Sequence, residues 1–447
     1  MKRLSRRALL KAAGAAGVAA AASSWPLAGC AAPSGKPADS GSRPRLTILQ
    51  WSHFVPRYDR WFDGEFTKAW GERHGVDVVV DHMSAAEINA RGAGEAVAGQ
   101  GHDLFLFISP PAAYEDQVLD LADVVAAVEK KHGPAVSLAQ RSNRNPRTGK
   151  WFAFSDSYVP DPGNYRIDLW ADAGFPKGPD SWEDLRVGGR VIKSRTGSPV
   201  GIGLSQEVDS NMTLRALLWS FGGAEQDERG RVVLDSPATV EALKFMRALY
   251  LEAMTPEVFT WDPSSNNRLM LSGRGSFIQN AISVTRAAEK DDPQMARRIG
   301  ISRPLAGPVR RMASAHLMNC WVIWKSARNP QAAKAFLADL IDASASVFRE
   351  SELYNMPCFP TTVPDAAKVL AEDPNGEPRG KYAVLAGALD WTGNIGYPGF
   401  ASAAADQVFN AFLIPLMFAR TARGDVSPQE AARDADREAK RIFERRA

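Results

Sequence analysis

Three short apolar runs alternate with two stretches of helical periodicity near the start of the chain. The runs cover residues 46–51, 76–80 and 104–108, and their β-branched and aromatic side chains favour buried strands. Between them, apolar residues recur every three to four positions over 58–73 and 85–98, which predicts two helices. An order of strand, helix, strand, helix, strand predicts a parallel sheet with crossover helices, and therefore an α/β fold.

The ends of these predicted strands indicate where a ligand would bind. Open parallel sheets bind ligands beyond the carboxyl ends of their strands. Trp51 and His53 follow the first run, and Ser109 follows the third. We therefore take Trp51, His53 and Ser109 as candidate ligand-binding residues.

The rest of the chain carries further helix and strand signals. Ser181 precedes Trp182 and two acidic residues, which is typical of a helix N-terminus. The pattern predicts a buried strand at 319–324 and helices at 211–221, 237–253, 330–341 and 429–446.

The first thirty residues have the composition of an export signal. Paired arginines at 6–7 precede a weakly apolar run that ends near Ala22, which is shorter than the ~20 residues that span a bilayer. This pattern resembles a twin-arginine signal peptide. Leu27-Ala28-Gly29-Cys30 resembles a lipobox, in which the cysteine is acylated and anchors the mature protein to a membrane. We expect a signal peptide at 1–29 and a flexible tether at 30–45; an ordinary cleaved signal with an incidental Cys30 is the alternative.

The export signal also changes the charge of the chain. Its five basic residues exceed the formal net charge of +3, so the remainder carries −2. That remainder has no block of five like charges, which argues against nucleic acid as a partner. We expect an exported protein, periplasmic or on the cell surface, anchored through Cys30.

The usual catalytic and metal-binding motifs do not occur in the sequence. It contains no G-x-S-x-G, no H-E-x-x-H and no G-x-G-x-x-G after a strand. Residues 188–194 resemble a phosphate-binding loop except that Ile192 replaces the required glycine. The histidines never pair at metal-ligand spacing. We expect no catalytic residue, cofactor or metal, although paired carboxylates of a glycosidase would leave no motif.

Cys320 and Cys358 are the two cysteines outside the export signal. In an oxidising compartment they form a disulfide if their Cα atoms come close enough. Two separate buried thiols are the alternative, and the sequence leaves both open.

Five segments resemble, in order, hallmark stretches of the family 1 extracellular solute-binding proteins of ABC importers. They are Gly163-Asn164-Tyr165-Arg166-Ile167-Asp168, Leu218-Trp219-Ser220-Phe221-Gly222-Gly223, Leu234-Asp235-Ser236-Pro237, Leu271-Ser272-Gly273-Arg274-Gly275-Ser276-Phe277 and Asn329-Pro330-Gln331-Ala332-Ala333. Arg166 departs from the pattern, because the family usually has asparagine after the tyrosine. The resemblance extends from about Leu46 to the C-terminus.

The resemblance implies a two-lobed periplasmic-binding-protein type II fold, with a ligand cleft between the lobes and several hinge crossovers. Lobe one would hold 46–155 and 308–362, and lobe two 156–307 and 363–447. The implied function is capture of a carbohydrate or related polar solute by hinge closure, followed by docking of a monomer on the transmembrane permease subunits. A secreted carbohydrate-active enzyme and a cell-surface scaffold of the same fold are the alternatives.

The resemblance and the loop composition add six candidate ligand-binding residues. Carbohydrate sites combine aromatic rings with fixed polar side chains, and the loop at 391–399 is dense in aromatic residues, glycine and proline. The six are Asp156, Tyr158, Asn211, Asn280, Trp391 and Tyr397. Arg166 and Arg286 are the candidates for binding an anionic ligand instead, such as a glycerol-phosphate compound.

Overall fold

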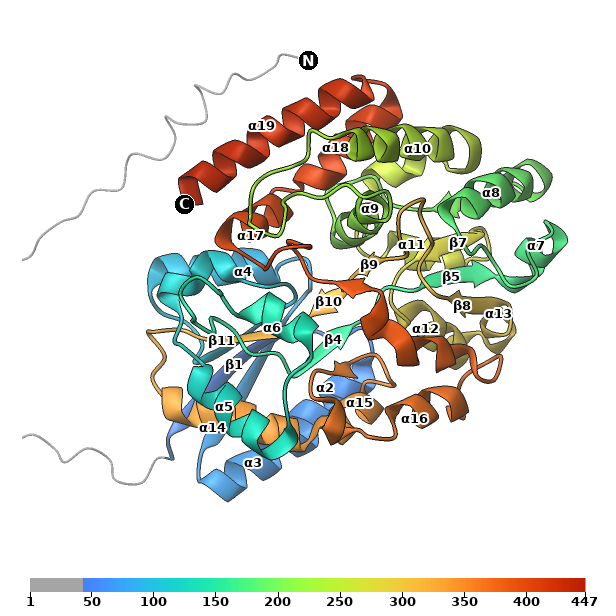
Figure 1. The fold of residues 1–447 in the computed structure, drawn as a ribbon. Helices are drawn as coiled ribbons and strands as arrows, with labels where there is room; N and C mark the ends of the chain where they lie inside the picture. The colour runs from blue at the N-terminus through green and yellow to red at the C-terminus, as the bar shows by residue number, and fades with distance from the viewer. Residues whose placement is uncertain (1–42, 447) are drawn as a thin grey trace, which may run out of the picture. The chain divides into compact units, whose positions relative to one another are not determined.

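A computed structural model describes residues 43–446 (Figure 1). The expected signal peptide and the lipidation at Cys30 lie outside the described residues. The first sheet has the strand order β11-β3-β1-β2. Strands β1 (Arg45–Trp51), β2 (Asp77–Met83) and β3 (Leu104–Phe107) are parallel, as the sequence predicts. Strand β11 (Cys320–Ile323) joins β3 in the antiparallel direction from far along the chain.

The helices that cover this sheet match the predicted ranges closely. The predicted helix at 58–73 consists of α2 (Pro56–Trp61), a π-helical segment η1 (Phe62–Phe66) and α3 (Thr67–His74). It ends at Gly75, whose φ of 64° suits glycine. Helix α4 (Ile88–Ala98) follows β2, and α14 (Pro330–Asp342) follows β11.

The second sheet has the order β6-β7-β5-β8 and is built from the middle of the chain. Its strands are β5 (Gly163–Arg166), β6 (Val200–Gly201), β7 (Phe277–Gln279) and β8 (Ile299–Ser302). Ser181 caps α8 (Trp182–Thr196), since its hydroxyl accepts a hydrogen bond from the backbone N–H of Asp184 at 3.0 Å. The predicted helices at 211–221 and 237–253 are α9 (Val208–Ser220) and α10 (Pro237–Ala253).

A small third sheet carries the chain between the two larger ones. Its order is β10-β4-β12, with β4 (Ser157–Val159) paired antiparallel to β10 (Leu317–Met318) on one side and to β12 (Met356–Pro357) on the other. Beside it, β9 (Ala313–Ser314) pairs in parallel with β13 (Thr392–Gly393). These short strands form the central band in Figure 1.

The two cysteines flank this third sheet. Cys320 is the first residue of β11, two positions after β10 ends, and Cys358 directly follows β12. The segment 154–157, which leads into β4, runs between them. Two strand spacings are about 9.6 Å, which exceeds the ~7 Å between Cα atoms that a disulfide can bridge. Both side chains are buried free thiols. The structure therefore supports two separate thiols and not the disulfide.

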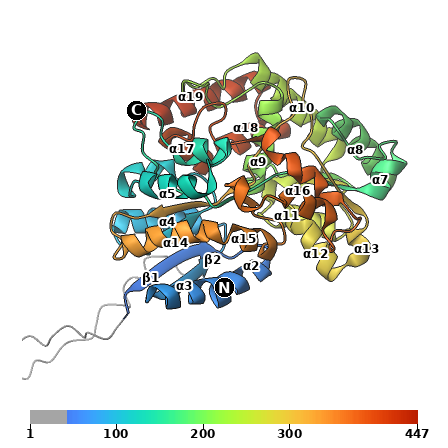
Figure 2. The ribbon, with the colours of Figure 1, turned by 60° about the horizontal axis from the view of Figure 1, so that its bottom comes forward.

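The last three helices pack on the second sheet's helices and reach back to the first sheet. They are α17 (Ala403–Asn410), α18 (Leu413–Arg423) and α19 (Pro428–Arg446). Helices α18 and α19, in red, lie against α10 in both views (Figure 1 and Figure 2). Helix α17 contacts η2 (Ala112–Gln117), which follows β3. No helix within residues 43–446 is long and apolar enough to span a bilayer.

The remaining elements connect these units. They are α5 (Ala122–His132), α6 (Ser137–Asn143), α7 (Ile167–Asp172), η3 (Pro256–Thr260), α11 (Ser265–Leu271), α12 (Ser283–Asp291), α13 (Pro293–Ala296), α15 (Ser344–Glu350), η4 (Pro360–Thr362), α16 (Ala366–Glu372) and η5 (Lys381–Asp390).

Candidate functional site

Eight buried polar and aromatic side chains lie where the chain crosses between the two sheets. We call them the crossover cluster: His53, Asp161, Asp209, Gln279, Asn280, His316, Tyr354 and Asn355. None is more than 6% exposed. They come from segments far apart in the sequence, and buried polar groups at such density need partners.

An imidazole between two carboxylates forms the part of the cluster nearest the second sheet. His316, between β9 and β10, has its Nδ1 3.1 Å from Oδ1 of Asp161 and its Nε2 3.7 Å from Oδ1 of Asp209. Asp161 follows β4, and Asp209 lies in the first turn of α9. Gln279, the last residue of β7, donates from Nε2 to Oδ2 of Asp161 at 2.9 Å. The crossover strands and the end of β7 thus bring His316 and Gln279 to the carboxylate of Asp161.

Burial and mutual charge shift the pKa values in this group. Burial raises the pKa of Asp209 to about 6, with His316 opposing the shift and Asp161 adding to it. Burial alone would lower the pKa of His316, but hydrogen bonding to Asp161 and the two nearby carboxylates raise it overall. One imidazole therefore lies between two carboxyl groups and can balance the charge of only one of them.

Asparagine side chains hold the Asp209 carboxylate from the other side. Asn266 donates from Nδ2 to Oδ2 of Asp209 at 2.6 Å. Asn280 lies next to it, with its Nδ2 2.8 Å from Oδ1 of Asn267 and 3.5 Å from Oδ2 of Asp209. Asn280 follows β7 directly, so the second sheet presents both Gln279 and Asn280 to the cluster.

His53 forms the first-sheet side of the cluster and is a neutral imidazole. Its ring lies 4.6 Å from that of Trp51, at the end of β1, and 5.1 Å from that of Tyr354. Burial lowers the pKa of His53 to about 4. Its Nδ1 accepts a hydrogen bond from the Val55 backbone N–H at 2.9 Å. The proton of the neutral ring is therefore on Nε2, which lies 3.2 Å from Oδ1 of Asn355.

A left-handed turn presents Tyr354 and Asn355 to the cluster. Glu352 and Leu353, just after α15, have φ values of 53° and 69°, a conformation that non-glycine residues seldom adopt. Arg286 on α12 donates from Nε to the carbonyl oxygen of Glu352 at 2.8 Å. Such backbone is often found at functional sites, where surrounding contacts hold it in place.

Three polar atoms of the crossover cluster are buried without a protein partner among the described residues. They are the hydroxyl of Tyr354, Nδ2 of Asn355 and Oε1 of Gln279. An unpaired buried polar group costs about 1–3 kcal/mol. Three of them at one junction indicate a place that accommodates a polar ligand.

Of the sequence candidates, His53 and Asn280 lie in the crossover cluster, and Trp51 stacks on His53. Tyr158 lies on the central crossover strand β4. Trp391 adjoins β13; it is 5% exposed, and its indole Nε1 has no partner among the described residues.

The other candidates make contacts elsewhere. Asp156 accepts a hydrogen bond from Nε1 of Trp321 at 2.8 Å inside the first sheet's core. Asn211 donates to the carbonyl oxygen of Phe409 at 2.9 Å, which joins α9 to α17. Tyr397 accepts a hydrogen bond from Arg310 at 2.7 Å in an exposed pair. Ser109 is buried after β3, ahead of η2.

The two arginines considered for an anionic ligand are occupied by neighbouring acids. Arg166 forms a two-pronged ion pair with Asp168, with N–O distances of 2.9 and 2.6 Å. Arg286 donates to Asp373 at 2.6 Å and to Glu289 at 2.8 Å. Among residues 43–446, no group of His, Cys, Asp or Glu side chains is arranged to hold a metal ion.

No local pattern in the sequence marks the other six members of the crossover cluster, which are Asp161, Asp209, Gln279, His316, Tyr354 and Asn355. Their shared property is position: each lies in or next to a crossover strand, at the end of β7, or in the first turn of α9. Only knowledge of where the chain crosses between sheets would have identified them.

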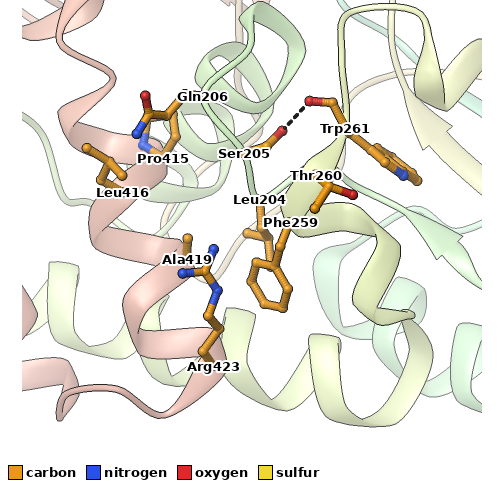
Figure 3. Close-up of a pocket in the computed structure, with 10 residues that line it drawn as sticks. All are labelled: Leu204, Ser205, Gln206, Phe259, Thr260, Trp261, Pro415, Leu416, Ala419 and Arg423. Atoms are coloured by element: carbon orange, nitrogen blue, oxygen red, sulfur yellow. Dashed lines mark hydrogen bonds between the residues drawn. The ribbon is translucent and has the colours of Figure 1, made fainter. Parts of the chain in front are cut away.

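A separate surface cavity lies on the side of α18 (Figure 3). It holds about 340 Å³ between α18 and η3. Phe259 and Trp261 form one wall, and the guanidinium of Arg423 lies 4.4 Å from the Phe259 ring. A larger groove of about 820 Å³ lies between the loops at 145–148 and 226–231 and the end of α19. Neither is lined by a residue of the crossover cluster.

Residues 56–345 match the family of bacterial extracellular solute-binding proteins, and the chain belongs to that family. A relative from Deinococcus radiodurans, described as a probable ABC transporter-binding protein, is 28% identical over 244 residues. That stretch is 52% of this chain and 55% of the relative, so it spans about half of each protein.

Solved structures confirm the two-lobed α/β fold. Maltose-bound MalE3 of T. maritima superposes with a TM-score of 0.72 at 18% identity, covering 89% of this chain and 99% of that one. A sugar transporter of Arthrobacter chlorophenolicus A6 with bound laminaribiose gives 0.74 at 14% identity, with 89% and 99% covered. An ABC transporter solute-binding protein of Agrobacterium radiobacter K84 in complex with ribitol gives 0.70 at 19% identity, with 91% and 100% covered.

Proposed function

We propose that the protein is the extracytoplasmic solute-binding component of an ABC importer and captures a carbohydrate or related polar solute in the crossover cluster. The observation that carries this proposal is the set of three buried polar atoms of the crossover cluster, on Tyr354, Asn355 and Gln279, that have no partner among the described residues. Family membership and the sugars and polyol named for proteins of the same fold support it.

The proposed mechanism is hinge closure about the third sheet. We assign lobe one to 46–155 and 308–362, and lobe two to 156–307 and 363–447. His53, Tyr354 and Asn355 would then contact the solute from lobe one, while Asp209, Gln279 and Asn280 contact it from lobe two. A solute that binds both sets favours the closed form, because only that form brings them together. The closed form would dock on the permease subunits.

Aromatic rings on the cluster and next to the crossover strands suit the apolar face of a sugar. Trp51 and His53 stack with their planes 24° apart. Trp391, next to β13, is nearly buried, and its indole N–H has no partner among the described residues. Aromatic faces cover the C–H groups of a ring, while polar groups bind its hydroxyls. We therefore retain Trp51 and Trp391 as proposed ligand-binding residues.

A ligand screen tests this function. A thermal-shift panel of sugars and polyols is expected to give a hit, because a ligand at ~100 times its Kd stabilises the folded state by about 2.7 kcal/mol. The same solute should contract the protein in X-ray scattering and be recovered chemically unchanged. Chemical conversion of the hit would show an enzyme, and binding without contraction would contradict hinge closure.

Two variants locate the site. Gln279→Ala removes the unpartnered Oε1 and should weaken binding of the hit about tenfold or more. Trp261→Ala, in the surface cavity of Figure 3, is the control and should leave the affinity unchanged. The reverse result would place binding in the surface cavity.

We also propose that the protein is held at a membrane surface by acyl chains on Cys30. The support is the lipobox-like Leu27-Ala28-Gly29-Cys30 after paired arginines. Cys30→Ser is expected to move the protein from the membrane to the soluble fraction, and mass spectrometry should find residues 1–29 removed from the native form. Membrane retention of the Cys30→Ser variant would contradict the anchor.

A further inference from the structure

The crossover cluster has donor and acceptor atoms that are left for a ligand, and we assign this inventory atom by atom. Since Nε2 of His53 carries the proton, it is the carbonyl oxygen of Asn355 that faces it, and the amide Nδ2 is left as a free donor. Gln279 faces the Asp161 carboxylate, which only accepts hydrogen bonds when ionised. Its amide nitrogen is therefore bound, and its Oε1 is left as a free acceptor.

Two further groups complete this inventory. Oδ1 of Asp209 lies 3.7 Å from Nε2 of His316, which is too far for a hydrogen bond. The described asparagine donors to this carboxylate bind Oδ2, so Oδ1 is a second acceptor that a ligand can use. The hydroxyl of Tyr354 both donates and accepts, and it has no partner among the described residues. The cluster thus offers two acceptors, one donor and one group that does both.

The charge around these groups is negative. Asp262, which also affects the pKa of Asp209, is paired with Arg268 at 2.9 Å. The charged groups that remain are the carboxylates of Asp161 and Asp209, with the single imidazole of His316 between them. The two arginines that the sequence offered for an anionic ligand are bound to Asp168 and to Glu289 with Asp373. In a buried site, an unpaired anion next to a carboxylate is strongly disfavoured.

From this inventory we infer that the crossover cluster takes an uncharged polyhydroxylated solute and rejects phosphate esters and acidic sugars. The inference rests on the proposed function and deepens it. A hydroxyl group donates and accepts at once, which matches a mixture of free donors and acceptors. A phosphate or carboxylate only accepts, so it would leave Gln279 Oε1 and Asp209 Oδ1 unpaired and facing its charge. An ammonium only donates, so it would leave Asn355 Nδ2 unpaired.

Matched ligand pairs test the inference. The probes are glucose with glucose 6-phosphate, glucuronate and glucosamine, and ribitol with ribitol 5-phosphate, titrated calorimetrically into the full mature chain. For whichever neutral compound binds, its charged partners are expected to bind at least 100-fold more weakly. Equal or tighter binding of a phosphate or carboxylate partner would overturn the inference and leave solute binding intact. No binding by any carbohydrate or polyol, charged or neutral, would count against the proposed function itself.

A charge-removing variant separates electrostatics from shape. Asp209→Asn keeps an oxygen acceptor but removes the charge, so discrimination against the phosphate partner should fall about tenfold or more while the neutral compound still binds. Asp172→Asn removes an equal charge from an exposed side chain on α7 and should leave the discrimination unchanged. Unchanged discrimination in Asp209→Asn would show that this carboxylate does not exclude anions.

Discussion

At the residue scale, two buried tyrosines offer a direct comparison. Tyr354 and Tyr382 are both fully buried. The hydroxyl of Tyr354 has no partner among the described residues, whereas that of Tyr382 lies 2.8 Å from both Thr285 and Glu289. Removing an unpaired buried hydroxyl is nearly neutral or stabilising, and removing a paired one costs about 1–2 kcal/mol.

We therefore predict opposite effects for the two phenylalanine variants. Tyr354→Phe should leave the free energy of unfolding unchanged or slightly higher and should weaken solute binding about tenfold. Tyr382→Phe should lower the free energy of unfolding by about 1–2 kcal/mol and leave binding unchanged. Denaturant unfolding and titration calorimetry measure the two quantities. A Tyr354→Phe variant that loses stability but binds normally would mean that this hydroxyl is structural.

The sequence predicted two members of the crossover cluster because they lie at recognisable places. His53 follows an apolar strand, and Asn280 lies in a stretch that resembles cleft-lining positions of the family. Asp161 and His316 are 155 positions apart and meet only because two crossover strands pair. No spacing rule links such residues, so the sequence could not reveal their contact.

At the element scale, hydrophobic periodicity was sufficient for the long helices and buried strands, but not for local irregularities. The predicted helix at 58–73 contains the π-helical segment Phe62–Phe66. Its wider turn brings Phe66 against both Phe62 and Trp61, with ring centroids 5.9 and 5.3 Å apart. Aromatic residues four and five positions apart can lie on one face of an α-helical or a π-helical turn, so their spacing does not distinguish the two. We attribute the π-helical turn to packing of Phe62 and Phe66 against Phe336 of α14.

Helix α17 carries a buried carboxylate that makes stability depend on pH. Asp406 accepts a hydrogen bond from the Ala113 backbone N–H in η2 at 2.9 Å. Burial raises its pKa to about 7. The groups that face it are Asn410 on α17, Tyr114 in η2, Cys320 on β11 and Arg446 on α19. Between pH 4 and 7 the folded state holds a proton that the unfolded state, with a pKa of about 3.9, has lost. This contribution to stability therefore falls as pH rises through that window.

We predict that Asp406→Asn is more stable than the native chain at pH 8, by on the order of 2–4 kcal/mol, and that the difference disappears near pH 4. The amide oxygen can still accept from Ala113, so the contact between α17 and η2 persists. Thermal unfolding at a series of pH values measures the difference. Asp172→Asn, at an exposed site on α7, is the control. A stability difference that does not change between pH 4 and pH 8 would show that Asp406 is ionised in the folded state over this whole range.

At the scale of the whole molecule, the two lobes of the described chain share one hydrophobic core. The largest cluster of buried apolar residues runs from Leu46 in β1 to Ile442 in α19 and includes side chains of both large sheets. A smaller, separate cluster around Ile278 of β7 and Ile299 of β8 covers part of the second sheet. Three paired strands cross between those sheets, and α17 ties the C-terminal helices to η2. Unfolding of one lobe would expose buried apolar surface of the other lobe to water, which favours cooperative unfolding of both.

We predict that both lobes unfold in one transition, even without a bound solute. Trp70 on α3 and Trp182 on α8 are nearly completely buried on opposite sides of the crossover, so 5-fluorotryptophan at each position reports on one lobe. Their native fluorine resonances should disappear at the same temperature, and a saturating solute should raise both midpoints equally. If Trp182 lost its native signal well before Trp70, the lobes would be independent folding units joined by a weak interface. In that case the shared core would not fix the relative position of the two halves of the crossover cluster. The bound solute would have to hold them together.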